Sequence, residues 1–164
     1  MGETIGKAAA VAVSSVGKRF LAKETGKTID AVTDVSLRLF PGTLTALVGP
    51  DGAGKTTLLR MMAGLLKIDE GKLEVLGIDV ALDPQAVQDR IGYMPQRVGL
   101  YEDLSVRENL DLYADLHGVP PGARTARYAR LLQMTGLASF TDRPAGKLSG
   151  GMKQKLGLAC TLVR

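Results

Sequence analysis

The sequence predicts an α/β part followed by an all-helical part, and three observations support this fold class. The apolar runs LTALV at 44–48 and IGYM at 91–94 are short and bounded by turn residues, which is typical of strands buried on both faces of a parallel sheet. A helical pattern begins directly after the glycine-rich segment 49–54. From about residue 105 onward the chain shows only helical patterns, separated by Pro and Gly.

The strand-rich part contains four further expected elements. Residues 10–20 indicate a strand that runs into a polar turn at 14–19. Apolar and polar residues alternate over 34–40, as in a strand with one buried face. Residues 56–66 predict a helix, and 73–76 a short strand between two glycines. The apolar face of that helix consists of Leu58, Met61, Met62 and Leu65.

The helical part begins with a capping box, in which Ser105 and Glu108 open a helix that extends to about His117. The turn residues 120–122 separate it from a second helix that ends at Gly136. A last helix follows a turn at 144–146. Its apolar positions are Met152, Leu156, Ala159 and Val163.

Composition limits the protein to a few classes. The chain has 164 residues, 45% of them hydrophobic, which is enough for a globular core. No apolar run reaches the roughly 18–20 residues of a membrane span, and 8–13 is too short for a signal peptide, so we expect a cytosolic chain. The single Cys160 excludes an internal disulfide, and its helical phase predicts a core position.

The positive charge is concentrated in the last third of the chain. Residues 1–117 carry 13 Lys and Arg against 16 Asp and Glu, whereas residues 118–164 carry 8 against 1. Arg124, Arg127 and Arg130 recur every three residues. We interpret them as a solvated helix face, with a nucleic-acid or membrane patch as the alternative.

The segment GPDGAGKTT matches the pattern G-x-x-x-x-G-K-[ST] and lies between an expected buried strand and an expected helix. Glycines let the backbone turn its N–H groups inward, and the helix N-terminus adds partial positive charge, so a triphosphate fits there. Lys55 is placed to reach the β- and γ-phosphates, and the Thr56 hydroxyl to reach Mg²⁺. The alternative is a plain glycine-rich turn. The candidate ATP-binding residues are Gly49, Pro50, Asp51, Gly52, Ala53, Gly54, Lys55, Thr56 and Thr57.

Together with this loop, LSGGMKQ at 148–154 and GYMPQ at 92–96 resemble the ATP-binding cassette (ABC) family, and the resemblance runs from about residue 9 to the end. It implies an α/β P-loop NTPase fold of ABC type, with a mixed-sheet core lobe and an all-helical signature lobe, incomplete at the C-terminus. We expect a tail at 1–8, the core lobe at 9–97 and the helical lobe at 98–164.

The resemblance implies further site residues. Ser149, Gly150 and Gly151 would cap the γ-phosphate of ATP held by a facing nucleotide-binding domain; alone they fit an N-cap serine with flexible glycines. Gln96 corresponds to the family's Q-loop glutamine, which touches Mg²⁺ and the attacking water. Phe20 corresponds to the aromatic residue that stacks on adenine, although a phenylalanine at a strand end also suits a core.

The resemblance also implies partners. The form LSGGMKQ looks like the branch that exports drugs, antibiotics, polysaccharides and lipids. Leu100 and Tyr101, beside Glu102, lie in the loop that faces a membrane-spanning permease in the family. We therefore expect a permease, a second nucleotide-binding domain, no nucleic acid, and a cytoplasmic position at the membrane's inner face. His117 is not in the place of the family's switch histidine, and we expect it on the surface.

Three family groups are not found in this sequence: the Walker B aspartate, the catalytic glutamate and the switch histidine, which follow the signature helix. We interpret the end at Arg164 as a truncation, assign no catalytic residue, and expect the sheet to pair with another copy, to rearrange or to be ordered in part. Two alternatives to an exporter subunit remain: a nucleotide-binding regulatory module without turnover, and an ABC ATPase that acts on nucleic acid.

Overall fold

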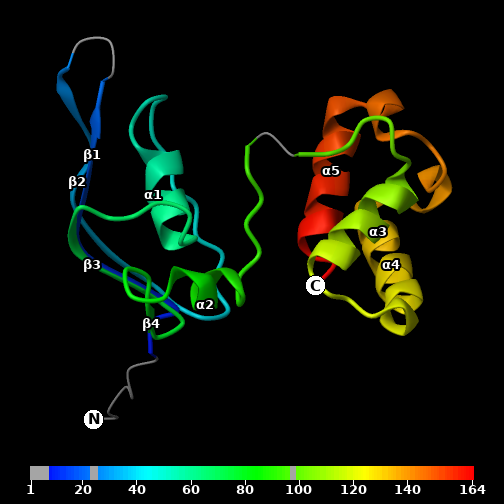
Figure 1. The fold of residues 1–164 in the computed structure, drawn as a ribbon, viewed down its shortest axis with the longest axis horizontal. Helices are drawn as coiled ribbons and strands as arrows, with labels where there is room; N and C mark the ends of the chain where they lie inside the picture. The colour runs from blue at the N-terminus through cyan, green and yellow to red at the C-terminus, as the bar shows by residue number, and fades with distance from the viewer. Residues whose placement is uncertain (1–7, 23–25, 97–98) are drawn as a thin grey trace. The chain divides into compact units, whose positions relative to one another are not determined.

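The computed structural model describes residues 8–22, 26–96 and 99–164. The chain divides into two compact units, Met1–Ile91 and Gly92–Arg164 (Figure 1). Each unit has its own hydrophobic core. The expected boundary between residues 97 and 98, and the expected tail 1–8 apart from Ala8, lie outside the described residues.

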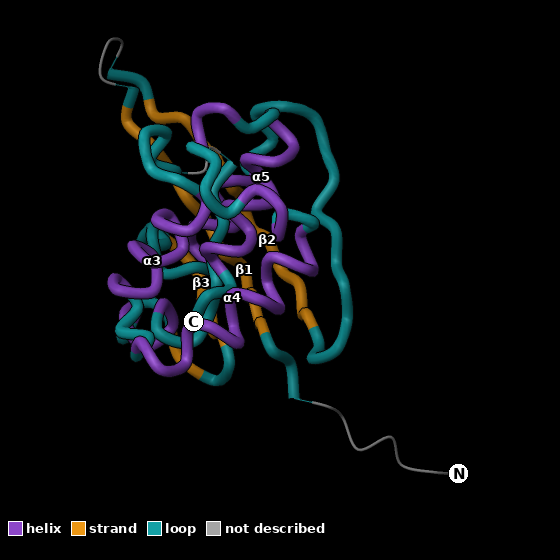
Figure 2. Tube along the Cα trace, turned by 90° about the vertical axis from the view of Figure 1, so that its right-hand side faces the viewer, coloured by secondary structure: helices purple, strands orange, loops and turns teal. Residues whose placement is uncertain are grey.

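The first unit is built on a four-stranded sheet with the order β2-β1-β3-β4, in which every pair is antiparallel. Figure 2 shows β2, β1 and β3 side by side. The strands are β1 (Val11–Leu21), β2 (Thr28–Leu39), β3 (Glu70–Val75) and β4 (Ile78–Asp79). The helices of this unit are α1 (Lys55–Met62) and α2 (Pro84–Gln88). One face of the sheet and helix α1 share a core formed by Val13, Val16, Val32, Leu58, Met61, Leu73, Val75, Val80 and Val87.

Strand β1 continues through the segment 14–19, so the expected polar turn there is wrong. The segment stays paired with β2 because the register of the two strands shifts between Val13 and Val16 and again between Val16 and Arg19. Ser15 has a φ of 48°, a left-handed conformation that bulges use to absorb an extra residue. The pairing of β1 with β2 therefore continues through residues whose composition is typical of a turn.

The expected buried strands at 44–48 and 91–94 are also wrong. Leu44 is fully exposed and Val48 is 88% exposed. A strand buried on both faces needs neighbouring strands along both edges. Within the described residues, no strand forms over either segment and no backbone hydrogen bond joins 44–48 to another segment. The apolar run consequently stays exposed on the first unit, without regular secondary structure.

Helix α1 is shorter than the expected 56–66, because Gly64 adopts a left-handed φ of 67° just after it. Leu58 and Met61 are buried as expected. Leu65, which lies beyond the helix end, is 51% exposed and does not belong to the apolar face.

The second unit consists of helices α3 (Val106–Leu116), α4 (Pro121–Thr135) and α5 (Gly150–Thr161), with short 3₁₀ turns at Ala138–Phe140 and Ala145–Lys147. The capping box at Ser105 and Glu108 is confirmed, as is the end of the second helix at Gly136, whose φ of 67° is left-handed. Leu156, Ala159, Cys160 and Val163 are fully buried. Burial raises the pKa of the Cys160 thiol to about 12, so this side chain behaves as an unreactive core residue.

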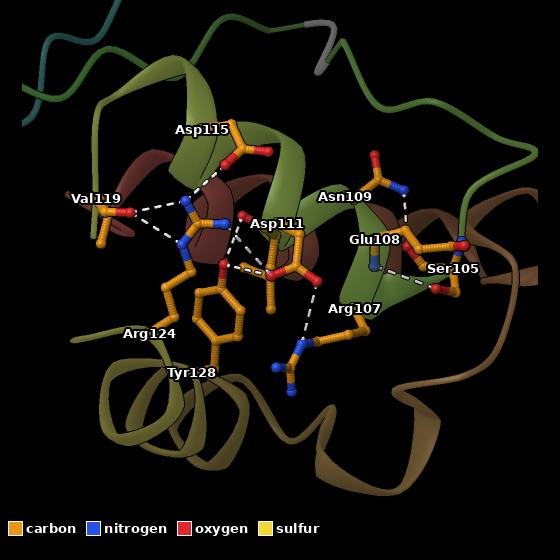
Figure 3. A network of polar contacts seen from close by, with 10 residues as sticks. Ser105, Arg107, Glu108, Asn109, Asp111, Asp115, Val119, Arg124 and Tyr128 are labelled. Carbon is orange, nitrogen blue, oxygen red and sulfur yellow. Dashed lines mark hydrogen bonds and ion pairs between the residues drawn. The ribbon is translucent and has the colours of Figure 1, made fainter. Parts of the chain in front are cut away.

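Polar contacts between α3 and α4 use one of the arginines that the sequence predicts on a solvated face (Figure 3). The guanidinium of Arg124 donates two hydrogen bonds to the carbonyl of Val119, at 2.9 and 2.7 Å, and one to the carboxylate of Asp115, at 2.6 Å. Its side chain is only 15% exposed. The solvated-face prediction is wrong for Arg124, because its charge closes the turn between the two helices. Arg127 is exposed yet donates to the carbonyl of Val163 at 2.9 Å.

Tyr128 lies at the centre of the same contacts and is 1% exposed. Its hydroxyl donates to the Asp111 carboxylate at 2.9 Å and lies 3.1 Å from the carbonyl oxygen of Leu110. The Arg107 guanidinium stands 4.8 Å from the ring centroid. Burial first, and then the contact with Asp111, raises the pKa of Tyr128 to about 12.

We expect Tyr128→Phe to lower the free energy of unfolding by about 1–2 kcal/mol at neutral pH, because a buried hydrogen bond is lost. An unfolded tyrosine ionises near pH 10, below the folded pKa of about 12. The wild-type advantage is therefore complete below about pH 10 and disappears as the pH rises toward 12. Urea unfolding across this range measures it, with Tyr101→Phe, an exposed position, as control. An advantage that stays constant with pH would contradict the assignment.

Candidate nucleotide-binding site

The glycine-rich loop lies directly before helix α1, as the sequence predicts. Gly52 and Gly54 both have a φ of 79°, a left-handed conformation that residues with a Cβ rarely adopt. Gly54 is the N-cap of α1 and has no side chain to cap the helix, and no acidic residue lies in the first turn. The free backbone N–H groups and the positive end of the helix dipole are thus not neutralised by a carboxylate of that turn.

A bulge in β2 fixes the position of this loop. Lys18 pairs with Val32 and Arg19 with Asp30, so Ala31 is left over between two paired residues. The carbonyl oxygen of Ala31 lies only 2.1 Å from the point where a Cβ on Gly54 would be. Gly54 must therefore be glycine for two reasons: its backbone conformation and the contact with Ala31.

The ammonium of Lys55 is directed into the loop. It donates hydrogen bonds to the carbonyl oxygens of Gly49, at 2.8 Å, and Pro50, at 2.6 Å. These are neutral acceptors, and a phosphate oxygen forms a stronger, charge-assisted bond with the same cation. Thr56 is exposed and Thr57 half-buried in the first turn of α1, and Asp51 and Ala53 are exposed in the loop. The structure therefore brings together all nine residues of the predicted loop.

Phe20 lies at the end of β1 and is 41% exposed, which does not match the core alternative. It pairs with Ile29, two residues before the bulged Ala31. Two residues of a strand span about 7 Å, so the backbone of Phe20 lies near the part of the sheet that touches the loop. This placement suits a platform for a base whose phosphates lie in the loop.

Ser149 is the N-cap of α5, and its hydroxyl accepts a hydrogen bond from the N–H of Met152 at 3.3 Å. Gly150 and Gly151 are exposed, and an added Cβ would meet nothing within 4 Å at either of them. Neither has a left-handed φ. Packing within the described residues therefore does not require these two glycines.

Gln96 belongs to the same unit as Ser149 and is exposed. Nearby, Leu100 packs against the helical core, whereas Tyr101 is 59% exposed. His117 is exposed at the end of α3, as expected. Of the predicted permease-facing loop, the tyrosine is the apolar group that faces outward.

Sequence reasoning missed Asn109, which is fully buried in α3. Its amide oxygen accepts from the N–H of Tyr101 at 3.0 Å, and its amide nitrogen donates to the carbonyls of Tyr101, Leu104 and Ser105 at 2.9–3.1 Å (Figure 3 shows the contact with Ser105). The sequence does hold a signal for this role, because Asn109 lies three positions after Val106, on the apolar face of the helix. A polar residue on such a face indicates a buried hydrogen-bonding group. Asn109 thereby fixes the loop before the helix.

That loop is connected to the start of α5. The N–H groups of Ala145 and Gly146 donate to the carbonyls of Leu104 and Glu102, each at 2.8 Å. The ammonium of Lys153 lies 2.6 Å from the Glu102 carboxylate. The segment that leads into Ser149 is consequently held by the loop that Asn109 organises.

The described residues offer no group of three or more His, Cys, Asp or Glu that could hold a metal ion. Mg²⁺ prefers six oxygen ligands and keeps several waters, with phosphate oxygens completing its shell. The exposed hydroxyl of Thr56 at the start of α1 fits one position of such a shell. The residues present therefore suit a magnesium ion that arrives with a nucleotide.

A lysine held in a glycine-rich loop at a helix N-terminus defines a P-loop nucleotide-binding protein. The chain belongs to the ABC transporter family, whose family model matches residues 32–164. The probable multidrug ABC transporter ATP-binding protein YbhF of Escherichia coli K12 is 55% identical over 94% of this chain and 26% of its own length. The daunorubicin resistance ATP-binding protein DrrA3 of Streptomyces coeruleorubidus is 38% identical over 94% of this chain and 47% of its own.

A solved structure, the dimeric ATP-binding cassette MJ0796 bound to ADP and Pi, has a TM-score of 0.81 and is 26% identical. The match covers 93% of this chain and 69% of that one. The predicted fold class, a P-loop domain of ABC type, is thus confirmed. This chain spans about a quarter to a half of the two curated relatives. No helix among the described residues is both long and apolar enough to cross a bilayer.

We expect Gly54→Ala to destabilise the protein much more than Gly52→Ala. Both substitutions put a Cβ on a left-handed backbone, which costs about 1–2 kcal/mol. Only Gly54→Ala also forces the Ala31 carbonyl to move, so its total cost should exceed about 3 kcal/mol. Urea unfolding of the two variants measures the difference. Equal losses would contradict the contact between β2 and the loop.

We expect Asn109→Ala to lower the free energy of unfolding by about 2–4 kcal/mol, because several buried polar groups lose their partner. The N–H of Tyr101 should also lose more protection against hydrogen exchange than the other backbone N–H groups of the helical unit, which a general loss of stability would not explain. Gln133→Ala removes an exposed amide from α4 and serves as control. Unchanged protection at Tyr101 would refute this role for Asn109.

Proposed function

We propose that this chain is the ATP-binding part of an ABC exporter and binds Mg·ATP through Gly49–Thr57. The observation that carries the proposal is Lys55, whose ammonium lies 2.6–2.8 Å from two loop carbonyls at the uncapped end of α1. In this role Lys55 binds the β- and γ-phosphates, Thr56 supplies a hydroxyl to Mg²⁺, and Phe20 stacks on the adenine. The names of YbhF and DrrA3 support export of a drug-like compound.

We propose a second role for the start of α5. Ser149 offers a hydroxyl, and Gly150 and Gly151 offer bare backbone at a helix N-terminus, which is a favourable place for a phosphate. In the proposal they cap the γ-phosphate bound by a second nucleotide-binding domain, and Gln96 approaches the Mg²⁺ in the assembled site. The dimeric state of MJ0796 supports this arrangement.

The remaining partners follow from the same proposal. Tyr101 is 59% exposed, and the side chain of Asn109 holds the backbone of its loop by hydrogen bonds. Such an exposed aromatic side chain suits contact with a membrane-spanning permease. The chain would then work at the cytoplasmic face of a membrane and, within a complete transporter, support ATP hydrolysis. Arg124 and Arg127 make hydrogen bonds within the helical unit, so they add little to a nucleic-acid surface.

We expect Lys55→Ala to weaken Mg·ATP binding by about 10–100-fold, because a charge-assisted hydrogen bond to phosphate contributes about 1.5–3 kcal/mol. Isothermal titration calorimetry with purified protein measures the dissociation constants. Lys67→Ala removes the same charge from an exposed position after α1 and should bind as wild type does. Equal affinity of Lys55→Ala and wild type would refute the proposed binding mode.

A further inference from the structure

Lys18 is a charged residue that the proposed site does not use, and its side chain is only 12% exposed. Its ammonium lies 2.7 Å from one carboxylate oxygen of Asp69. The other oxygen of Asp69 accepts a hydrogen bond from the backbone N–H of Arg19 at 2.8 Å. The hydrogen bond from Lys18, and then the one from Arg19, lower the pKa of Asp69, so this carboxylate stays charged. Lys18 is thus held by an ion pair with Asp69, the residue directly before β3.

The same ammonium stands over the ring of Phe20, 5.6 Å from its centroid. This distance lies within the range of a cation–π contact. Residues two apart on a strand project from the same face, so Lys18 and Phe20 are neighbours along β1. Phe20 nevertheless remains 41% exposed. The ring therefore has a cation on one side and a large accessible area.

The backbone between the two residues is also fixed. The Asp69 carboxylate holds the N–H of Arg19, and the Arg19 side chain forms ion pairs with Asp30 on β2 and with Glu70 on β3. The ion pair with Asp30 spans 3.2 Å. The two strands beside β1 thus hold the segment that carries Phe20. An aromatic platform that is immobilised before binding loses less entropy when a ligand stacks on it.

We infer that Lys18, held by Asp69, is a positioning residue for the nucleobase of the bound nucleotide. Its ammonium restrains the Phe20 ring and draws electron density toward one face, which makes the opposite face a better partner for an electron-rich purine. The inference rests on the proposed function, because it requires Phe20 to stack on the base. It adds a determinant of base binding that acts separately from Lys55 on the phosphates.

The test compares Mg·ATP with Mg·tripolyphosphate, which has the phosphates without the base. Calorimetry on Lys18→Met should show about two- to fivefold weaker ATP binding, because a cation–π contact of this kind contributes modestly. Tripolyphosphate should bind as it does to wild type. Lys18→Arg should retain the ATP affinity, because a guanidinium can pair with Asp69 and lie over the ring.

Two controls separate this role from general effects of charge and folding. Lys72→Met removes a lysine that pairs with Glu74 on the same sheet and should leave ATP binding unchanged. In a Phe20→Ala background, Lys18→Met should have no further effect on ATP affinity. Urea unfolding of each variant verifies that it is fully folded under the titration conditions, so the dissociation constants compare folded proteins.

Three results would overturn the inference: an unchanged ATP affinity in Lys18→Met, an equal loss for tripolyphosphate, or a Lys18 effect that persists without Phe20. The second result would mean that Lys18 contacts phosphate directly. In each of these cases the proposed function still stands if Lys55→Ala weakens both ligands. If Lys55→Ala binds ATP as wild type does, the proposed function fails instead.

Discussion

The candidate site depends on the contact between the Ala31 carbonyl and the N-cap of α1. The bulge in β2 turns this carbonyl toward Gly54, at 2.1 Å from where a Cβ would lie, and only glycine allows the approach. The contact sets where α1 begins and hence where its free N–H groups point. Lys55, the first residue of the helix, then has the loop carbonyls within reach. The geometry of the candidate site is therefore a consequence of strand irregularity as much as of the loop sequence.

The helical unit has a comparable organising residue in Asn109. A buried amide with satisfied donors and acceptor specifies one loop conformation, since any other would leave polar groups unpaired. The loop in turn holds the segment before Ser149 through backbone hydrogen bonds and the ion pair between Glu102 and Lys153. The loop that contains Tyr101 and Glu102 is thus joined to the start of α5 by backbone hydrogen bonds and one ion pair.

Local sequence signals predicted the elements whose stability is local. The cap at Ser105, the helix end at Gly136 and the position of the glycine-rich loop before α1 were predicted because each depends on a few neighbouring residues. The strand expected at 44–48 failed because an apolar run forms a strand only with partners from elsewhere in the chain. Arg124 was misplaced for a similar reason: periodicity places it on a helix face, but its partners Val119 and Asp115 come from the preceding turn and helix.

The two proposed phosphate sites use glycine for different physical reasons. At Gly54 the chain itself demands glycine, because the backbone is left-handed and a carbonyl occupies the space of a Cβ. Gly150 and Gly151 have ordinary backbone conformations and open space around them, and each costs about 1 kcal/mol of helix stability relative to alanine. No contact within the described residues requires a glycine at either position and so offsets this loss of helix stability. In the proposed role of α5, a phosphate from outside the chain that approaches this backbone closely would offset the cost.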